Sequence, residues 1–308
     1  MKKAFRQKIA AAMVVVMTCG QFQAIPVRAA ADRRPEEMET PYYESPVSDV
    51  RMMALGTSGL ATPSEADSPD SPWSGDYLFY GSYQQAAAED EEAAPVKWRV
   101  LSPNSLQGGS SPDTASDSNA KTVLLMADQV LDKVPYMEAF QSDPKWDSSS
   151  MRQWLNDENT GFYGTAFEAE EQKAIVLSNG AMVPGVSEAS AAEELTNPSV
   201  GGSRIFLLSQ AEVSYSGFGF YAPEEGGTSE WSVTGDQENA SRILKATPMA
   251  YSRGADISDD KVSPWWLRST GSLYGNPDVM FNMEVIDSYG MPAACEPSSD
   301  LPVGVVPA

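Results

Sequence analysis

The chain has 308 residues, with 43 acidic and 21 basic side chains, no histidine and a formal net charge of −22. A protein surface with this excess of acidic side chains repels phosphate backbones and anionic lipids. We therefore expect neither nucleic acid nor a membrane surface as a partner. Without histidine there can be no Ser-His or Cys-His pair and no histidine metal ligand, which excludes most common hydrolase mechanisms.

The first 31 residues have the pattern of a secretory signal peptide. Basic residues at the start precede an apolar run over residues 9–17, and three alanines follow at 29–31. The run is shorter than the roughly 20 residues that a membrane-spanning helix needs. We therefore expect cleavage near residues 29–31, a secreted or cell-surface location and no membrane span in the exported chain. Loss of five basic and no acidic side chains would take the formal charge from −22 to −27.

The rest of the chain is divided into a tether and one domain. Residues 32–72 are rich in Pro, Glu, Ser and Asp, which predicts a disordered, acidic, solvated segment. Residues 73–308 are enough for one sizeable domain and too few for two. Cys19 is expected to be removed with the leader, and the remaining Cys295 cannot form an intramolecular disulfide. Stability must therefore come from the core.

Two strands are expected at the start of the domain, over residues 77–83 and 96–101, joined as a hairpin by an acidic loop. The first is rich in aromatic residues, and the second alternates apolar and basic residues. A Ser/Gly/Asp-rich insertion loop over 103–120 separates this hairpin from a buried strand over 122–126.

Helical patterns follow. A serine at 148–150 can cap a helix whose apolar face carries Met151, Trp154 and Leu155. A second helix is predicted over 167–175, with carboxylates in its first turn, and a long loop spans 180–202.

The last third of the chain contains short elements. A strand is predicted over 204–208, and Ser209 with Glu212 has the spacing of a capping box. A short helix is expected over 239–246, and strands over 265–268, 279–285 and 301–307. This order is mixed α+β, without the strand-helix alternation of a parallel sheet.

Taken in chain order, several runs resemble one family of exported bacterial proteins. They are FYGSYQQ at 79–85, KWRVL at 97–101, VLD at 130–132, PY at 135–136, WDSSSMRQWLN at 146–156, GFYGTAF at 161–167, FLLS at 206–209 and WWLRS at 265–269. The family is a domain of unknown function, number 6273 in its series, and the resemblance covers roughly residues 73–308. The ordered set is far more specific than any one run.

This family is similar to the C-type-lectin-like fold that formylglycine-generating enzymes share. The resemblance implies a single mixed domain with short helices, antiparallel strands and long loops, whose terminal strands pair. The usual closing Gly-Val-Arg-Pro-Ala appears here with Val306 in place of arginine. The formylglycine enzymes need paired active-site cysteines, and only Cys295 remains here, so their activity is not carried over.

The adjacent tryptophans Trp265 and Trp266 are the most distinctive candidates for a site. Neighbouring side chains of a strand point to opposite faces, so the two indoles cannot fill the same core layer. In one interpretation, one indole is core, the other packs under a loop, and Arg268 satisfies buried carbonyls. In the other, one indole is a stacking platform for a sugar ring or a peptide. Arg268, Tyr274 and Asn282 are then ligand-binding residues, with Tyr289 as a further candidate.

No catalytic residue, metal site or cofactor is predicted. Calcium is the metal most compatible with this composition, because it prefers carboxylate and carbonyl oxygens. The runs NPD at 276–278 and WLND at 154–157 resemble calcium-sugar signatures of C-type lectins. Their order is reversed and they lie far apart, so a simple turn is the favoured interpretation of 276–278.

Three classes of function stay open at this point. The first is a non-catalytic binding module for a carbohydrate or a surface protein. The second is a structural or interaction domain of a surface assembly without a small-molecule ligand. The third is a carboxylate-dependent hydrolase, which requires two acids converging in a cleft, one with a raised pKa.

Overall fold

The computed structural model describes residues 59–88, 91–105, 122–139, 141, 144–178, 198–222, 238–258, 260–271, 282–297 and 301–308. The expected signal peptide, the tether up to residue 58 and Tyr274 lie outside the described residues, as do most of the two expected loops at 103–120 and 180–202.

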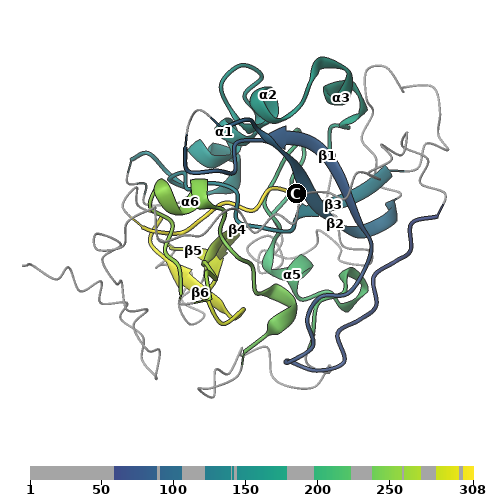
Figure 1. Ribbon diagram of the computed structural model, residues 1–308. Coiled ribbons are helices and arrows are strands. Elements are labelled where there is room, and N and C mark those ends of the chain that lie inside the picture. Colours follow the sequence, from purple (N-terminus) through teal and green to yellow (C-terminus); the bar gives the residue numbers. More distant parts are fainter. Residues whose placement is uncertain are drawn as a thin grey trace, which may run out of the picture.

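Two three-stranded antiparallel sheets form the framework, together with short helices (Figure 1). The first sheet has the order β1-β2-β3, with β1 at Tyr77–Tyr83, β2 at Ala94–Ser105 and β3 at Thr122–Ala127. The second has the order β4-β5-β6, with β4 at Trp265–Gly271, β5 at Asn282–Ile286 and β6 at Pro292–Cys295. The mixed α+β class predicted from the sequence is confirmed.

The predicted hairpin is formed by β1 and β2, and its two faces differ. Leu78 is paired with Trp98 on the face toward the core, where the Trp98 and Phe167 rings stack with centroids 6.3 Å apart. Tyr77 and Phe79 alternate with Leu78 and therefore lie on the opposite face. There they pair with the basic residues of β2, as the alternation of that strand requires.

Gly81 lets β1 bend where its register with β2 shifts, between Phe79 and Ser82. Its φ of +67° lies in the left-handed region, and an added Cβ would lie 2.5 Å from the Ala166 carbonyl oxygen and 2.6 Å from the Phe167 ring. A glycine is needed at this position for both reasons.

Substitution of Gly81 by alanine is therefore expected to lower the free energy of unfolding by about 2 kcal/mol. Urea unfolding followed by tryptophan fluorescence measures the change. Gly201 is the matched control, because its Cβ would meet only the flexible Ser199 hydroxyl, at 3.2 Å. An equal loss of unfolding free energy in Gly81→Ala and Gly201→Ala would contradict the expectation that a side chain at Gly81 strains the bend.

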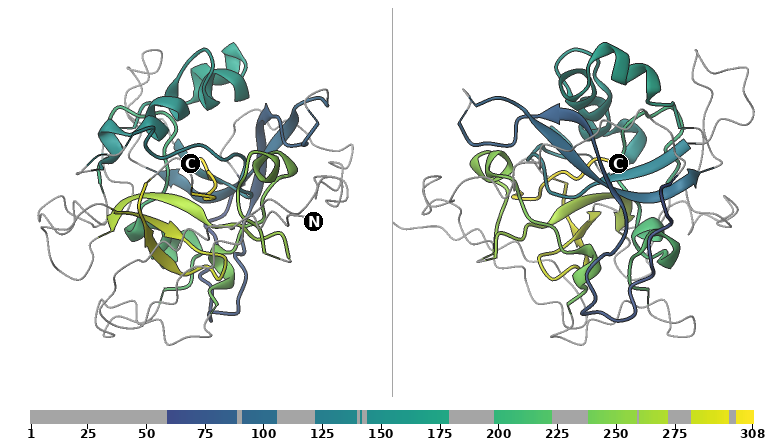
Figure 2. Two further views of the ribbon diagram at one scale, coloured as in Figure 1. Left: turned by 90° about the vertical axis from the view of Figure 1, so that its left-hand side faces the viewer. Right: turned by 45° about the vertical axis from the view of Figure 1, so that its right-hand side comes forward.

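Three helices lie together over the core-facing side of the first sheet, as Figures 1 and 2 show: α1 at Ser150–Asn156, α2 at Phe162–Ala166 and α3 at Ala169–Ala174. The predicted serine cap of α1 is confirmed, since the Ser149 hydroxyl accepts from the Arg152 N–H at 3.0 Å. Glu168 and Glu171 form a capping box at the start of α3.

The other helical segments among the described residues are single turns. They are the 3-10 turns η3 at Trp146–Ser148, η4 at Ser216–Phe218 and η5 at Ala240–Arg242, and the helices α5 at Gln210–Val213 and α6 at Pro248–Ser252. The capping box of Ser209 and Glu212 is confirmed at α5. The helix expected over 239–246 is wrong beyond η5, because Lys245 and Ala246 form bridges with Val262 and Val130 instead.

The C-terminal segment lies between the two sheets (Figure 2). Gly304 bridges Trp265 of the second sheet, while the Ala127 N–H of the first sheet donates to the Pro307 carbonyl at 2.9 Å. Phe206 and Ala308 exchange two backbone hydrogen bonds, of 3.0 and 2.8 Å. The strands expected over 204–208 and 301–307 are thus paired extended segments rather than members of a sheet.

The end of the expected tether contacts the domain. Ser64 bridges Ser74, Ala66 is buried, and the Ala240 N–H donates to the Pro69 carbonyl at 2.7 Å. Within the described residues, contacts with the domain extend back to Ala61, whose N–H donates to the Asp76 carboxylate at 2.7 Å, ahead of Trp73, the start expected from composition.

Candidate functional site

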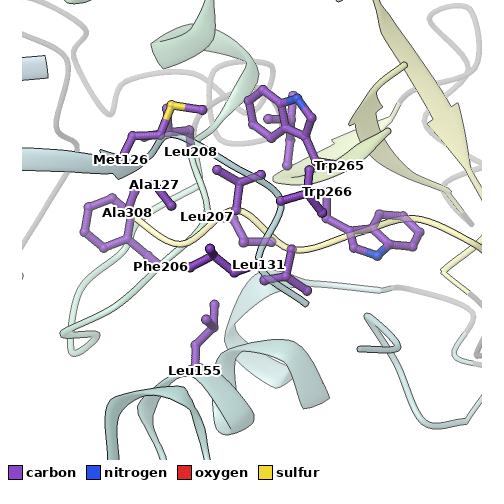
Figure 3. Close-up of a cluster of buried hydrophobic side chains, with 14 of the residues drawn as sticks. Met126, Ala127, Leu131, Leu155, Phe206, Leu207, Leu208, Trp265, Trp266 and Ala308 are labelled. Carbon is purple, nitrogen blue, oxygen red and sulfur yellow. The ribbon is translucent and has the colours of Figure 1, made fainter. Parts of the chain in front are cut away.

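The two tryptophans that dominate the sequence are both core residues. Trp265 is 0% and Trp266 1% exposed, and Figure 3 shows their indoles pointing away from one another among apolar side chains. The Trp265 Nε1–H donates to the Arg242 carbonyl at 3.2 Å, and the Trp266 ring lies 5.4 Å from that of Tyr136. Both faces of β4 are covered here, so neither indole offers a stacking surface.

Arg268 belongs to a buried ion pair. Its Nη1 lies 2.5 Å from Oε2 of Glu212 and its Nη2 2.6 Å from Oε1, and both side chains are fully buried. The same guanidinium donates to the carbonyls of Leu207, at 2.7 Å, and Pro198, at 2.8 Å. The interpretation in which Arg268 satisfies buried carbonyls matches this geometry, and its role is to join β4 to α5.

Asn282 and Tyr289 lie apart from the two tryptophans. Asn282 is partly buried at the first position of β5 and pairs with Gly271, whereas Trp265 pairs with Ile286 at the far end of that strand. Tyr289 is 58% exposed in the turn after β5. The structure therefore assembles no ligand surface around Trp265 and Trp266 from these residues.

Asp132 is the centre of a buried polar cluster. Its Oδ2 accepts hydrogen bonds from the Tyr83 hydroxyl and the Arg253 guanidinium, and its Oδ1 accepts from the Lys133 N–H at 2.7 Å. Burial raises the pKa of Asp132, and these donors act against that rise. Both carboxylate oxygens accept hydrogen bonds, which join β1, the C-cap of α6 and Lys133 at this residue, as is typical of a structural cluster rather than of a catalytic acid.

Glu284 on β5 is a second, partly buried acid. Desolvation raises the pKa of its carboxyl from 4.5 to about 8, and Oε2 is buried without a hydrogen-bond partner among the described residues. The pKa of this carboxyl is higher in the folded than in the unfolded state, so its protonated form stabilises the fold at pH values below the unfolded pKa. This contribution is lost as the pH rises through the folded pKa. Stability should therefore fall between about pH 4.5 and pH 8.

Glu284→Gln is expected to raise the unfolding free energy by about 1–3 kcal/mol at pH 8.5 and to change it little at pH 4. Urea titrations at the two pH values measure this difference. Glu65→Gln removes the same charge from an exposed position and should leave the pH dependence unchanged. Equal pH profiles for parent and Glu284→Gln would contradict the raised pKa.

The described residues contain neither grouped metal-binding side chains nor long apolar helices. There, no three His, Cys, Asp or Glu residues are grouped so that they could hold a metal ion. No helix formed by these residues is long and apolar enough to cross a bilayer.

An exposed polar and aromatic surface lies instead on the outer face of the first sheet. Tyr77 is 40% exposed there, and the Lys97 ammonium lies 3.8 Å from its ring centroid. Lys97 also forms an ion pair with Asp128, with 2.9 Å between Nζ and Oδ2. We call Tyr77, Phe79, Lys97 and Asp128 the Tyr77 face.

The Tyr77 face is held in place from beneath. The Trp73 indole is buried and donates to the Phe218 carbonyl at 2.8 Å. It packs against the Tyr77 ring in a T-shaped arrangement with centroids 5.2 Å apart. Arg99 lies over the Trp73 ring and donates from Nε to Oδ1 of Asp128 at 2.7 Å. Burial, and then the Asp128 carboxylate, raise the pKa of Tyr77, so its hydroxyl is a neutral donor at physiological pH.

The chemistry of the Tyr77 face is that of recognition. An aromatic ring, an ammonium donor and a carboxylate acceptor lie side by side, and the carboxylate is shared between Lys97 and Arg99. The sequence signal for this face was the alternation of Lys97 and Arg99 along β2, opposite the aromatic residues of β1. That signal cannot tell which face of the hairpin meets solvent.

A family model described as "Domain of unknown function (DUF6273)" matches residues 120–296, more than half of the chain. Neither the curated proteins nor the solved structures contain a match to this chain. The matched region includes β3, the helices and the second sheet, whereas β1, β2 and Tyr77 precede it.

Proposed function

The chain belongs to the family of the domain of unknown function DUF6273, and we propose that this member is a secreted or cell-surface binding module without catalytic activity. Its ligand is a carbohydrate or a surface protein. The observation that carries this proposal is the Tyr77 face, where a partly exposed aromatic ring is immobilised beside a donor and an acceptor. Such preorganised polar and aromatic surfaces favour binding because little side-chain entropy is lost.

The leader at residues 1–31 and the acidic composition support export, and the resemblance to the C-type-lectin-like fold supports recognition by loops and faces of a rigid scaffold. The environments of the two acids Asp132 and Glu284 support the hydrolase hypothesis less well than they support a binding module. The acceptor atoms of Asp132 are occupied by Tyr83, Arg253 and Lys133, and the pKa of Glu284 is raised by burial alone, without a contribution from a second acid.

A glycan-array screen of the purified full chain, run with calcium and again with chelator, tests the proposal. Binding to a defined set of glycans in both conditions is the expected result. Loss of all signals in chelator would instead point to calcium-dependent recognition. Absence of glycan binding, together with absence of a saturable protein partner on the bacterial surface, would favour the structural domain of a surface assembly.

A further inference from the structure

We propose that the Tyr77 face binds a neutral pyranose ring of a polysaccharide, an inference that rests on the proposed binding function. The face offers three kinds of contact within one patch: a ring for the apolar side of a sugar, an ammonium donor and a carboxylate acceptor. Neighbouring sugar hydroxyls both donate and accept hydrogen bonds, so they match the Lys97 and Asp128 pair.

The aromatic contact comes from the part of Tyr77 that stays exposed. The Lys97 ammonium lies over one face of the ring, 3.8 Å from its centroid, and the Trp73 ring packs against it with centroids 5.2 Å apart, so a sugar would contact the remaining surface of this residue, which is 40% exposed. A sugar stacks on such a ring through its C–H groups, which are attracted to the negative face of the π system. Phe79, one pleat along β1 and also partly accessible, extends the apolar surface in the strand direction.

The polar contacts come from the ion pair. The Lys97 side chain is 37% exposed and has three N–H donors, one of which is directed to Asp128 Oδ2 at 2.9 Å. The Asp128 side chain is 16% exposed and is fixed through Oδ1 by Arg99 at 2.7 Å. A hydroxyl pair can therefore bind without any rearrangement of the protein, because both charged groups are already placed.

The charge of the chain indicates that the ligand is neutral. A formal charge of −22, or −27 after loss of residues 1–31, repels acidic polysaccharides over a Debye length of about 8 Å at physiological salt. The face itself adds only one net positive charge to this balance, since Asp128 pairs with both Lys97 and Arg99. A neutral hexose polymer meets no such barrier.

Isothermal titration of the full chain with a soluble glucan, a mannan and a galactan, and with polygalacturonate as the acidic comparison, tests the inference. The parent should bind at least one neutral polymer and bind the acidic one more weakly. Tyr77→Ala should weaken binding about tenfold or more, and Tyr77→Phe should keep it within about threefold. Lys97→Met should weaken it by about tenfold.

Tyr289→Ala is the matched control, because it removes another exposed tyrosine, on the turn after β5, and should leave affinity unchanged. Thermal unfolding of each variant confirms that it is folded. Unchanged binding in Tyr77→Ala would overturn the inference while leaving the binding function intact. Preference for polygalacturonate would overturn the neutral-ligand assignment. If no polysaccharide binds but a surface protein does, the proposed function stands and the sugar site is abandoned.

Discussion

Arg268→Leu is expected to lower the free energy of unfolding by about 3–5 kcal/mol. The substitution leaves the Glu212 carboxylate buried without its partner and removes the donors to the carbonyls of Leu207 and Pro198. Loss of one member of a buried ion pair costs more than loss of both, because the remaining charge is uncompensated. Urea unfolding at pH 7 measures the change.

Arg268→Lys separates charge from geometry. Lysine keeps the positive charge but cannot donate to both Glu212 oxygens and two carbonyls at once, so an intermediate loss is expected. The double variant Arg268→Leu with Glu212→Leu should recover part of the stability, though not all, since the Glu212 cap on the Ser209 N–H is lost as well. A loss below about 1 kcal/mol in Arg268→Leu would contradict the buried pair.

Trp266→Ala is the second substitution with a large expected effect, a loss of about 3–5 kcal/mol. The indole is 1% exposed and packs on Tyr136, so its removal leaves a cavity lined by apolar groups. Trp265→Ala should cost a similar amount, because that indole is 0% exposed. Denaturant midpoints, compared with that of Tyr289→Ala, give the measurement.

The same pair of variants separates the two interpretations of the tryptophans. A stacking platform predicts that one of them loses ligand binding while keeping the stability of the parent. Core packing predicts that both lose stability, and that binding is lost only as far as the fold is lost. Near-parental stability of Trp266→Ala would therefore contradict the position described for it.

The hairpin and the helix caps follow from local rules, which explains why the sequence predicted them well. Alternation along 77–83 and 96–101 is satisfied by pairing within one hairpin, and Ser149 and Ser209 cap helices within three residues of themselves. These features depend on neighbours in the chain. The helix expected over 239–246 failed where Lys245 and Ala246 pair with distant segments, which no local pattern shows.

The candidate site could not be predicted from the sequence alone, because its location depends on how distant segments pack in three dimensions. Strand alternation correctly placed Trp265 and Trp266 on opposite faces of β4, but whether a face is covered depends on other segments. The second sheet meets Gly304 of the C-terminal segment beside Trp265, and Tyr136 lies against Trp266. Among the described residues, the outer face of β1 has no comparable cover over Tyr77, which is 40% exposed.

Hydrogen–deuterium exchange of the full chain, with and without the neutral polysaccharide that binds most tightly, tests the central claim most directly. If the polysaccharide binds to the Tyr77 face, amide exchange should become slower over Tyr77–Tyr83 and over the first half of β2, around Lys97. Exchange in the turn that carries Tyr289 should change little. Protection confined to the second sheet, or no protection in the first sheet at saturating ligand, would contradict the assignment of the binding surface to β1 and β2.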